Sequence, residues 1–147
     1  MPYDFEPISV GDHIRKQRLQ LGLIQRELAQ HLGINPWTVL NWEKGHSEPP
    51  ISSIPAILEF LGYDPFPMAE TIPERLLAKR REMGWTIKQA GAAVGADPST
   101  WGDWERGGTI LLREHRAAIA ELLNVPLDSL NKTMVARWGQ ARKRASF

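Results

Sequence analysis

The sequence predicts an all-α protein made of two similar units, and three observations support this prediction. The segment 35–45 returns as the segment 97–107, sixty-two positions later. Each copy begins with Asn or Asp, which can cap a helix, followed by proline, and each ends with glycine, which favours helix termination. Elsewhere, apolar residues recur at helical spacings of three and four positions. One helical unit present twice is the simplest explanation of this pattern.

The first unit is expected to contain four helical segments, at residues 11–21, 24–32, 35–45 and 51–61. In the first segment, Ile14, Arg18 and Leu21 are spaced so that they share one face of the helix. Pro55 lies inside the last segment, so this segment is expected to begin as a turn and to become regular helix near that proline.

The second unit repeats this order, with helices expected at residues 72–83, 86–94, 97–107 and 114–123. Two prolines in the segment 63–67 predict a semi-stiff linker between the units. The expected domains are therefore residues 8–66 and 72–130, followed by a basic C-terminal tail or helix at residues 131–147.

The chain has 147 residues and a formal net charge of +1, but the charge is distributed unevenly. Residues 1–68 carry 5 basic and 8 acidic side chains, whereas residues 69–147 carry 13 basic and 9 acidic ones. The acidic balance of the first unit argues weakly against nucleic acid as its partner. A DNA-binding surface there would depend on where the basic residues lie, not on the net charge.

Composition also argues against several classes of protein. The chain has no cysteine, which removes disulfides and thiolate zinc sites and fits a cytoplasmic protein. No signal peptide and no apolar run of about 20 residues is present, so no membrane partner is expected. The four histidines lie in different segments, without a glycine-rich phosphate loop or metal-ligand spacing. We therefore expect no enzymatic activity, no cofactor and no metal.

The segment 35–45 has two faces with different chemistry. Val39 and Trp42 are three positions apart and can both face a core, while Trp37, Asn41 and Lys44 lie on another side. Asn41 is the best candidate for reading a base, because Asn can pair bidentately with adenine. Trp37 could equally pack on a neighbouring domain or contact thymine methyl groups. This outer face is typical of a helix that enters a DNA groove.

Several residues of the first unit form one pattern in fixed register: Arg18, Gly22-Leu23, Gln25, Leu28-Ala29, Leu32-Gly33, Thr38-Val39 and Asn41-Trp42-Glu43-Lys44-Gly45. In this pattern, residues 11–66 resemble the helix-turn-helix domain of the Xre and phage Cro/C1 repressor family, and residues 73–130 resemble a second, more divergent copy. The resemblance implies two tandem lambda-repressor-like domains of about five short helices each. It also implies a bacterial or phage protein that binds operator DNA, regulates transcription and usually dimerises.

The resemblance assigns DNA contacts in both units. In the first, Gln25 would contact a phosphate, Lys44 would lie near the backbone, and four residues would face base edges in the major groove: Pro36, Trp37, Leu40 and Asn41. Asn35 is first a helix cap whose position also allows a phosphate contact, and Thr38 is a further candidate. In the second, the corresponding candidates are Lys88, Ser99, Thr100, Asp103 and Arg106. The resemblance also implies internal ion pairs between Arg18 and Glu43 and between Arg80 and Glu105.

The sequence departs from the family pattern at several positions. Ile24 replaces the usual Thr or Ser cap, which weakens the start of that helix by roughly 1 kcal/mol. Ile87 stands where the phosphate-binding Gln is expected, and Gly102 and Asp103 fall at base-facing positions. Asp103 would repel phosphates, although it could accept a hydrogen bond from cytosine N4. The second copy is therefore expected to bind DNA poorly or not at all.

The sequence thus predicts a sequence-specific DNA-binding transcriptional regulator of the repressor type, which reads the major groove with residues 35–44. Double-stranded DNA is the expected partner, and a second copy of the chain or a regulatory protein is a further candidate. The alternative is a protein-binding module of the same fold, such as an antiactivator or antitoxin, with weak or no DNA binding. The acidic balance of residues 1–68 favours this alternative, whereas the five basic side chains of residues 132–147 favour DNA.

Overall fold

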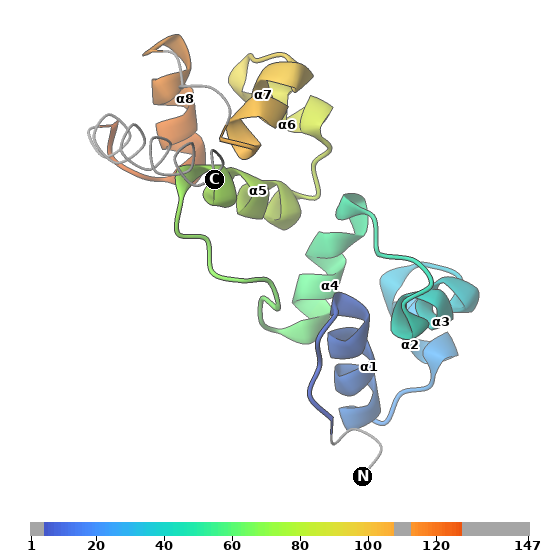
Figure 1. Cartoon of the computed structure of the whole chain (residues 1–147). Coiled ribbons are helices and arrows are strands. Elements are labelled where there is room, and N and C mark those ends of the chain that lie inside the picture. The colour runs from blue at the N-terminus through green and yellow to red at the C-terminus, as the bar shows by residue number, and fades with distance from the viewer. Residues whose placement is uncertain (1–4, 108–112, 128–147) are drawn as a thin grey trace, which may run out of the picture. The chain divides into compact units, whose positions relative to one another are not determined.

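The computed structural model describes residues 5–107 and 113–127, apart from the side chain of Arg113. Within these ranges it contains eight α-helices, one short 3₁₀ helix and no β-strand, which confirms the all-α prediction (Figure 1). The chain divides into two compact units, residues 1–67 and 68–147, and each is described by itself. None of the helices in the described ranges is long and apolar enough to cross a membrane.

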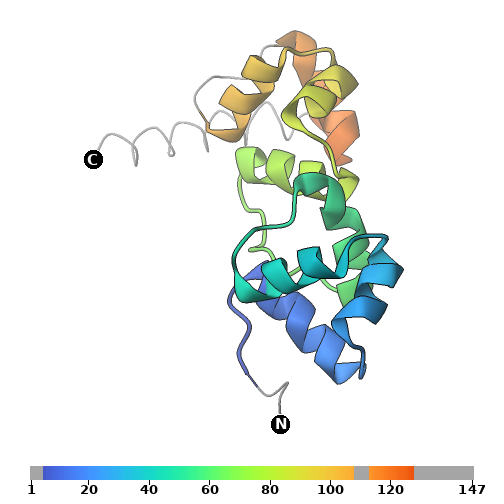
Figure 2. The ribbon, with the colours of Figure 1, turned by 90° about the vertical axis from the view of Figure 1, so that its right-hand side faces the viewer.

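The first unit consists of α1 (Val10–Gln20), α2 (Gln25–Leu32), α3 (Pro36–Lys44), the 3₁₀ helix η1 (Ile51–Ser53) and α4 (Ile54–Leu61). Helix α3 packs against both α1 and α2, and α4 packs against α1 (Figures 1 and 2). The expected turn before regular helix near Pro55 is confirmed, because η1 leads directly into α4. The first unit thus has four α-helices and one 3₁₀ turn.

A continuous apolar core joins all four α-helices of the first unit. Its buried members are Ile14, Leu28, Ala29, Val39, Trp42, Ile54, Ile57, Phe60 and Leu61. Val39 is fully buried and Trp42 is 4% exposed, so these two side chains fix which face of α3 turns inward.

Gly11 allows α1 and α3 to approach closely. A Cβ atom added at Gly11 would lie 1.9 Å from the backbone oxygen of Trp42, far inside van der Waals contact. No larger residue fits here unless the backbone shifts. The second unit has Pro73 at the matching position, so the two copies do not share this close contact.

Leu21 is not part of the core, although its spacing places it on the same helical face as Ile14 and Arg18. Its side chain is 55% exposed, whereas Ile14 and Arg18 on the same helix are buried. The physical reason is that α1 ends at Gln20, and Leu21 is the C-cap before Gly22, whose φ is 71°. The helical spacing therefore no longer applies at position 21.

The predicted linker contacts the first unit through Tyr63 and Phe66. The Tyr63 hydroxyl lies 2.8 Å from His13 Nδ1. Asp64 Oδ1 accepts a hydrogen bond from the Phe66 N–H at 2.8 Å, and the Phe66 side chain packs against the first core.

The second unit contains α5 (Ile72–Met83), α6 (Ile87–Val94), α7 (Pro98–Glu105) and α8 (Arg113–Leu123). Helix α7 packs against α5 and α6, and α8 contacts the same two helices (Figure 1). The buried core is formed by Ile72, Leu76, Ala90, Val94, Trp101, Trp104, Ile119 and Ala120. The arrangement of α5, α6 and α7 thus repeats that of α1, α2 and α3.

The expected C-terminal tail or helix at residues 131–147 lies outside the described residues.

Candidate nucleic-acid interface

Helix α3 is held in place from both ends. Asn35 Oδ1 accepts a hydrogen bond from the Trp37 N–H at 2.8 Å, and Pro36 occupies the first helical position. At the other end, Gly45 adopts φ of 75° and its N–H bonds back to the last turn. These caps satisfy backbone groups that would otherwise be unpaired, so α3 is a short helix with well-defined ends.

The outward side of α3 carries side chains suited to a DNA groove. Trp37 is 67% exposed, Lys44 is exposed, and Asn41 is half-buried. Val39 and Trp42 lie in the core on the opposite side. The structure therefore brings these three outward residues of α3 to one side of a helix whose other side is anchored.

The remaining first-unit candidates have different environments. Asn35 and Pro36 are exposed, and Thr38 and Leu40 are half-buried. The tight turn between α2 and α3 is closed by Gly33, which has φ of 70°. This turn places the start of α2 and the start of α3 in the helix-turn-helix arrangement.

The pair of Arg18 and Glu43 connects α1 to α3 from the inside. Arg18 Nε lies 2.7 Å from Glu43 Oε2, and Arg18 Nη2 lies 2.8 Å from Oε1. Arg18 Nη1 also donates to the Leu23 oxygen at 2.8 Å. The side chains are 10% and 3% exposed, so both charges depend on each other for compensation.

Gln25 belongs to this internal network. Its Nε2 donates to Glu43 Oε1 at 3.2 Å. The resemblance assigns a phosphate contact to Gln25, but in the free chain the amide provides a third donor to a buried carboxylate. The start of α2 has another cap that sequence reasoning missed: Glu27 Oε1 accepts from the Ile24 N–H at 3.0 Å, which offsets the absence of a hydroxyl at Ile24.

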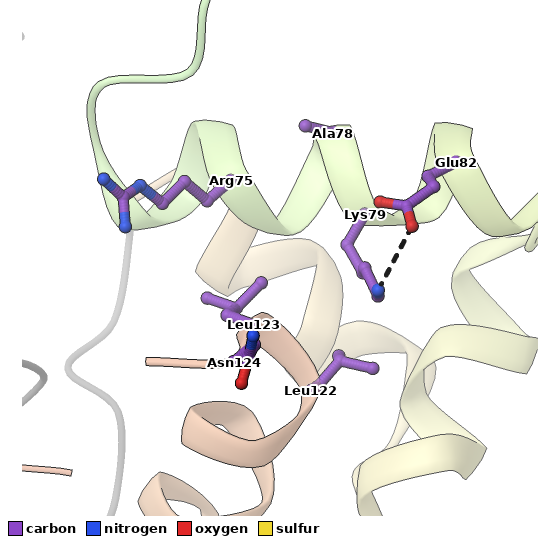
Figure 3. Close-up of a pocket in the computed structure, with 7 residues that line it drawn as sticks. All are labelled: Arg75, Ala78, Lys79, Glu82, Leu122, Leu123 and Asn124. Atoms are coloured by element: carbon purple, nitrogen blue, oxygen red, sulfur yellow. Dashed lines mark hydrogen bonds and ion pairs between the residues drawn. The ribbon is translucent and has the colours of Figure 1, made fainter. Parts of the chain in front are cut away.

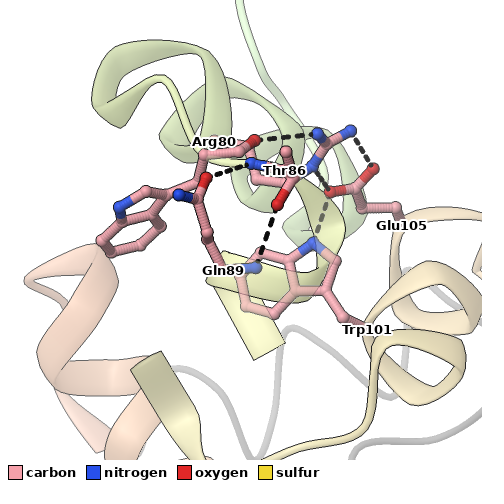
Figure 4. A network of polar contacts seen from close by, with 6 residues as sticks. Arg80, Thr86, Gln89, Trp101 and Glu105 are labelled. Carbon is pink, nitrogen blue, oxygen red and sulfur yellow. Dashed lines mark hydrogen bonds and ion pairs between the residues drawn. The ribbon is translucent and has the colours of Figure 1, made fainter. Parts of the chain in front are cut away.

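The second unit contains the same network with one donor exchanged (Figure 4). Arg80 Nε lies 2.5 Å from Glu105 Oε2, Nη2 lies 3.0 Å from Oε1, and Nη1 donates to the Trp85 oxygen at 3.1 Å. Trp101 Nε1 donates to Glu105 Oε2 in place of a glutamine amide.

This exchange explains why Ile87 can replace glutamine. Ile87 packs against the second core, and the buried indole of Trp101 stands where the first unit has Val39. The third donor to the carboxylate is therefore supplied from α7 instead of from α6. The sequence contains a sign of this exchange, because Gln25 and Val39 change together between the two copies.

The start of α7 differs from the start of α3. Asp97 occupies the N-cap position, but its side chain makes no cap hydrogen bond among the described residues, which contradicts the expected repeat of the Asn35 cap. The end differs as well: Arg106 is the C-cap in the right-handed helical conformation, and Gly107, with φ of 70°, follows it.

The outward side of α7 carries an ion pair that α3 lacks. Arg106 Nη2 lies 2.5 Å from Asp103 Oδ1, and the two side chains are 67% and 44% exposed. Lys88 and Ser99 are exposed and Thr100 is half-buried. The charges of Asp103 and Arg106 thus compensate each other at the surface of the second unit.

An open pocket lies between α5 and α8 (Figure 3). This open pocket has a volume of about 340 Å³ and is lined by Arg75, Ala78, Lys79, Glu82, Leu122, Leu123 and Asn124. Lys79 and Glu82 form an ion pair across 3.5 Å. None of these lining residues belongs to α6 or α7, so the pocket is distinct from the helix-turn-helix surface. The described parts of the chain contain no group of His, Cys, Asp or Glu that could hold a metal ion.

In the first unit, α2 and α3 are joined by a tight turn with glycine. One side of α3 is packed in the core, and its other side presents polar residues. This arrangement defines a helix-turn-helix DNA-binding protein. The family model for the Cro/C1-type helix-turn-helix matches residues 14–67 and again residues 76–130, and the chain belongs to this family. No curated protein and no solved structure matches the chain. The protein is therefore a helix-turn-helix regulator that binds DNA, with two tandem copies of the domain.

Proposed function

We propose that this protein is a repressor-like transcriptional regulator that recognises a specific DNA sequence with α3. The observation that carries the proposal is the outward triad of Trp37, Asn41 and Lys44, on a helix anchored by Val39, Trp42 and the Arg18–Glu43 pair. A groove-reading helix needs such anchoring, because loose side chains lose more entropy on binding.

Each outward residue has a distinct task in the proposed complex. Asn41 pairs with adenine, Trp37 makes apolar contact with thymine methyl groups, and Lys44 neutralises a phosphate. Asn35 is exposed at the start of α3, and its side-chain amide can donate to a phosphate there while its Oδ1 caps the helix. Repression follows if the bound protein blocks the access of polymerase to a promoter.

A protein-binding role of the same fold is the second candidate. The first 68 residues carry net charge −3, and the Asp103–Arg106 pair removes free positive charge from α7. Both features weaken general attraction to phosphates. A second copy of this chain or a regulatory protein would then be the partner.

Selection from a random pool of duplexes, followed by a salt series on the selected site, tests the proposal. The logarithm of the binding constant should fall linearly with the logarithm of salt concentration, with a slope of about −0.9 for each neutralised phosphate. A flat salt response, or a pool that shows no enriched sequence, would contradict specific DNA binding and favour the protein-binding role.

Asn41→Ala tests the base-reading step. We expect a loss of about 1–3 kcal/mol on the selected site, together with relaxed preference at one base position. Gln20→Ala is the matched control, because Gln20 is an exposed amide at the end of α1, outside the helix-turn-helix. Equal effects of the two variants would refute a specific role for Asn41.

A further inference from the structure

Gly102 lies inside α7, where glycine is unfavourable because it loses more conformational freedom on folding than any other residue. The matching residue of the first unit is Leu40. A Cβ atom added at Gly102 would lie 3.2 Å from Arg106 Nη1 and 3.7 Å from Arg106 Cζ. The guanidinium of Arg106 thus lies directly against the helix at position 102, and glycine leaves the room for it.

Asp103 keeps the guanidinium at this place. The 2.5 Å ion pair runs from Arg106 Nη2 to Asp103 Oδ1, one helical turn toward the start of α7. Arg106 is the C-cap of α7, and its side chain runs back along the helix to positions 102 and 103. Lys44, its counterpart in the first unit, is exposed and makes no ion pair within the described residues.

The guanidinium therefore lies at the position on α7 that corresponds to Leu40 on α3, which faces the bases. It does not lie at the position that corresponds to Lys44, which faces the DNA backbone. The planar fork of Arg matches the O6 and N7 acceptors of guanine in the major groove. A guanidinium that is already held by a carboxylate loses less rotational freedom when it binds. Its solvent exposure of 67% leaves N–H groups available for a base edge.

We propose that Arg106 reads a guanine in the major groove and that Asp103 is its positioning residue, so that α7 prefers a G·C pair where α3 prefers an A·T pair. This inference rests on the proposed DNA recognition by the chain. It assigns a base preference to the second domain and a function to Gly102 and Asp103, two residues of α7 that depart from the first copy.

The test uses the full-length chain and a random pool of duplexes, with the wild type, Arg106→Lys and Asp103→Ala compared. The wild type should enrich a guanine in the half of the site bound by the second domain. Arg106→Lys keeps the charge but loses the fork, so discrimination for that guanine should fall by roughly 5- to 150-fold, while binding to unselected DNA is unchanged. The half of the site bound by α3 serves as the internal control and should keep its preference in both variants.

Asp103→Ala separates positioning from simple charge compensation. Binding to unselected DNA should rise, because a carboxylate is removed from a surface that faces phosphates, but the preference for guanine should fall. A merely structural role for Asp103 would not produce these opposite changes. A general gain in binding with the guanine preference kept would show that Asp103 only compensates the charge of Arg106, and it would overturn the positioning role.

Replacing the selected guanine by 7-deazaguanine removes the N7 acceptor and keeps Watson–Crick pairing. The wild type should bind this duplex about tenfold more weakly, and Arg106→Lys, which lacks the planar fork, should show a smaller difference between the two duplexes. Equal wild-type affinity for both duplexes would overturn the inference. A wild type that selects bases only in the half bound by α3 would overturn it and leave the proposed function intact, whereas no selection in either half would refute both.

Discussion

Glu43→Ala should destabilise the first domain by about 3–5 kcal/mol, because it removes one member of a buried ion pair. Arg18 would keep its charge in a side chain that is only 10% exposed, with Nε and Nη2 left without their acceptors. The remaining bond from Arg18 Nη1 to the Leu23 oxygen compensates only part of this loss. A loss of this size is a large fraction of the total stability of a domain, which is typically about 5–15 kcal/mol.

Two further variants show how large the effect of Glu43→Ala should be by comparison. Gln25→Ala removes a single 3.2 Å hydrogen bond to Glu43 and leaves the ion pair complete, so it should cost only about 0.5–1.5 kcal/mol. The double variant Arg18→Met with Glu43→Leu removes both charges and should cost less than Glu43→Ala alone, since no unpaired charge remains buried.

Hydrogen exchange with mass-spectrometric readout is the suitable assay, because tryptophans lie in both units and total fluorescence would mix them. Protection should fall in residues 10–61 and remain unchanged in the described helices of the second unit. If Glu43→Ala costs no more than Gln25→Ala, or if the double variant is the least stable of the three, the buried pair does not hold α1 against α3 as we infer.

The remaining predictions concern packing, capping and the bound complex. Gly11→Ala should destabilise the first domain by about 1–3 kcal/mol, because its Cβ would meet the Trp42 oxygen at 1.9 Å; unchanged urea unfolding would contradict the close helix contact. Asn35→Ala should cost about 1 kcal/mol, whereas Asp97→Ala should cost clearly less, because Asn35 makes a cap hydrogen bond and Asp97 does not; equal shifts of the unfolding midpoints would refute this difference. Footprinting should show that one chain protects two adjacent, unequal half-sites, and a symmetric footprint containing two chains would instead identify the second domain as a dimerisation domain.

Much of the fold was predictable because its determinants are local. Helix ends depend on residues within one turn, so Asn35, Pro36 and Gly45 identify α3 without knowledge of any other segment. The offset of sixty-two residues then transfers the same interpretation to α7. The inward position of Val39 and Trp42 follows from helical spacing. At Leu21 the same rule fails, because the helix ends one residue earlier and the backbone turns away.

Only the tertiary structure decided how the polar side chains are shared between helices. The carboxylate of Glu105 accepts a hydrogen bond from Trp101, whereas the carboxylate of Glu43 accepts one from Gln25. Which donor is used depends on the side chain that α2 or α6 places next to the carboxylate. The position of Arg106 over Gly102 likewise depends on the path of a long, flexible side chain, which residue spacing does not determine. Sequence by itself determined the helices, their repeat and their inward faces, since these follow from local backbone and burial preferences. The hydrogen-bond partners within and around the recognition surface required the packed structure, because they depend on distances between residues far apart in the chain.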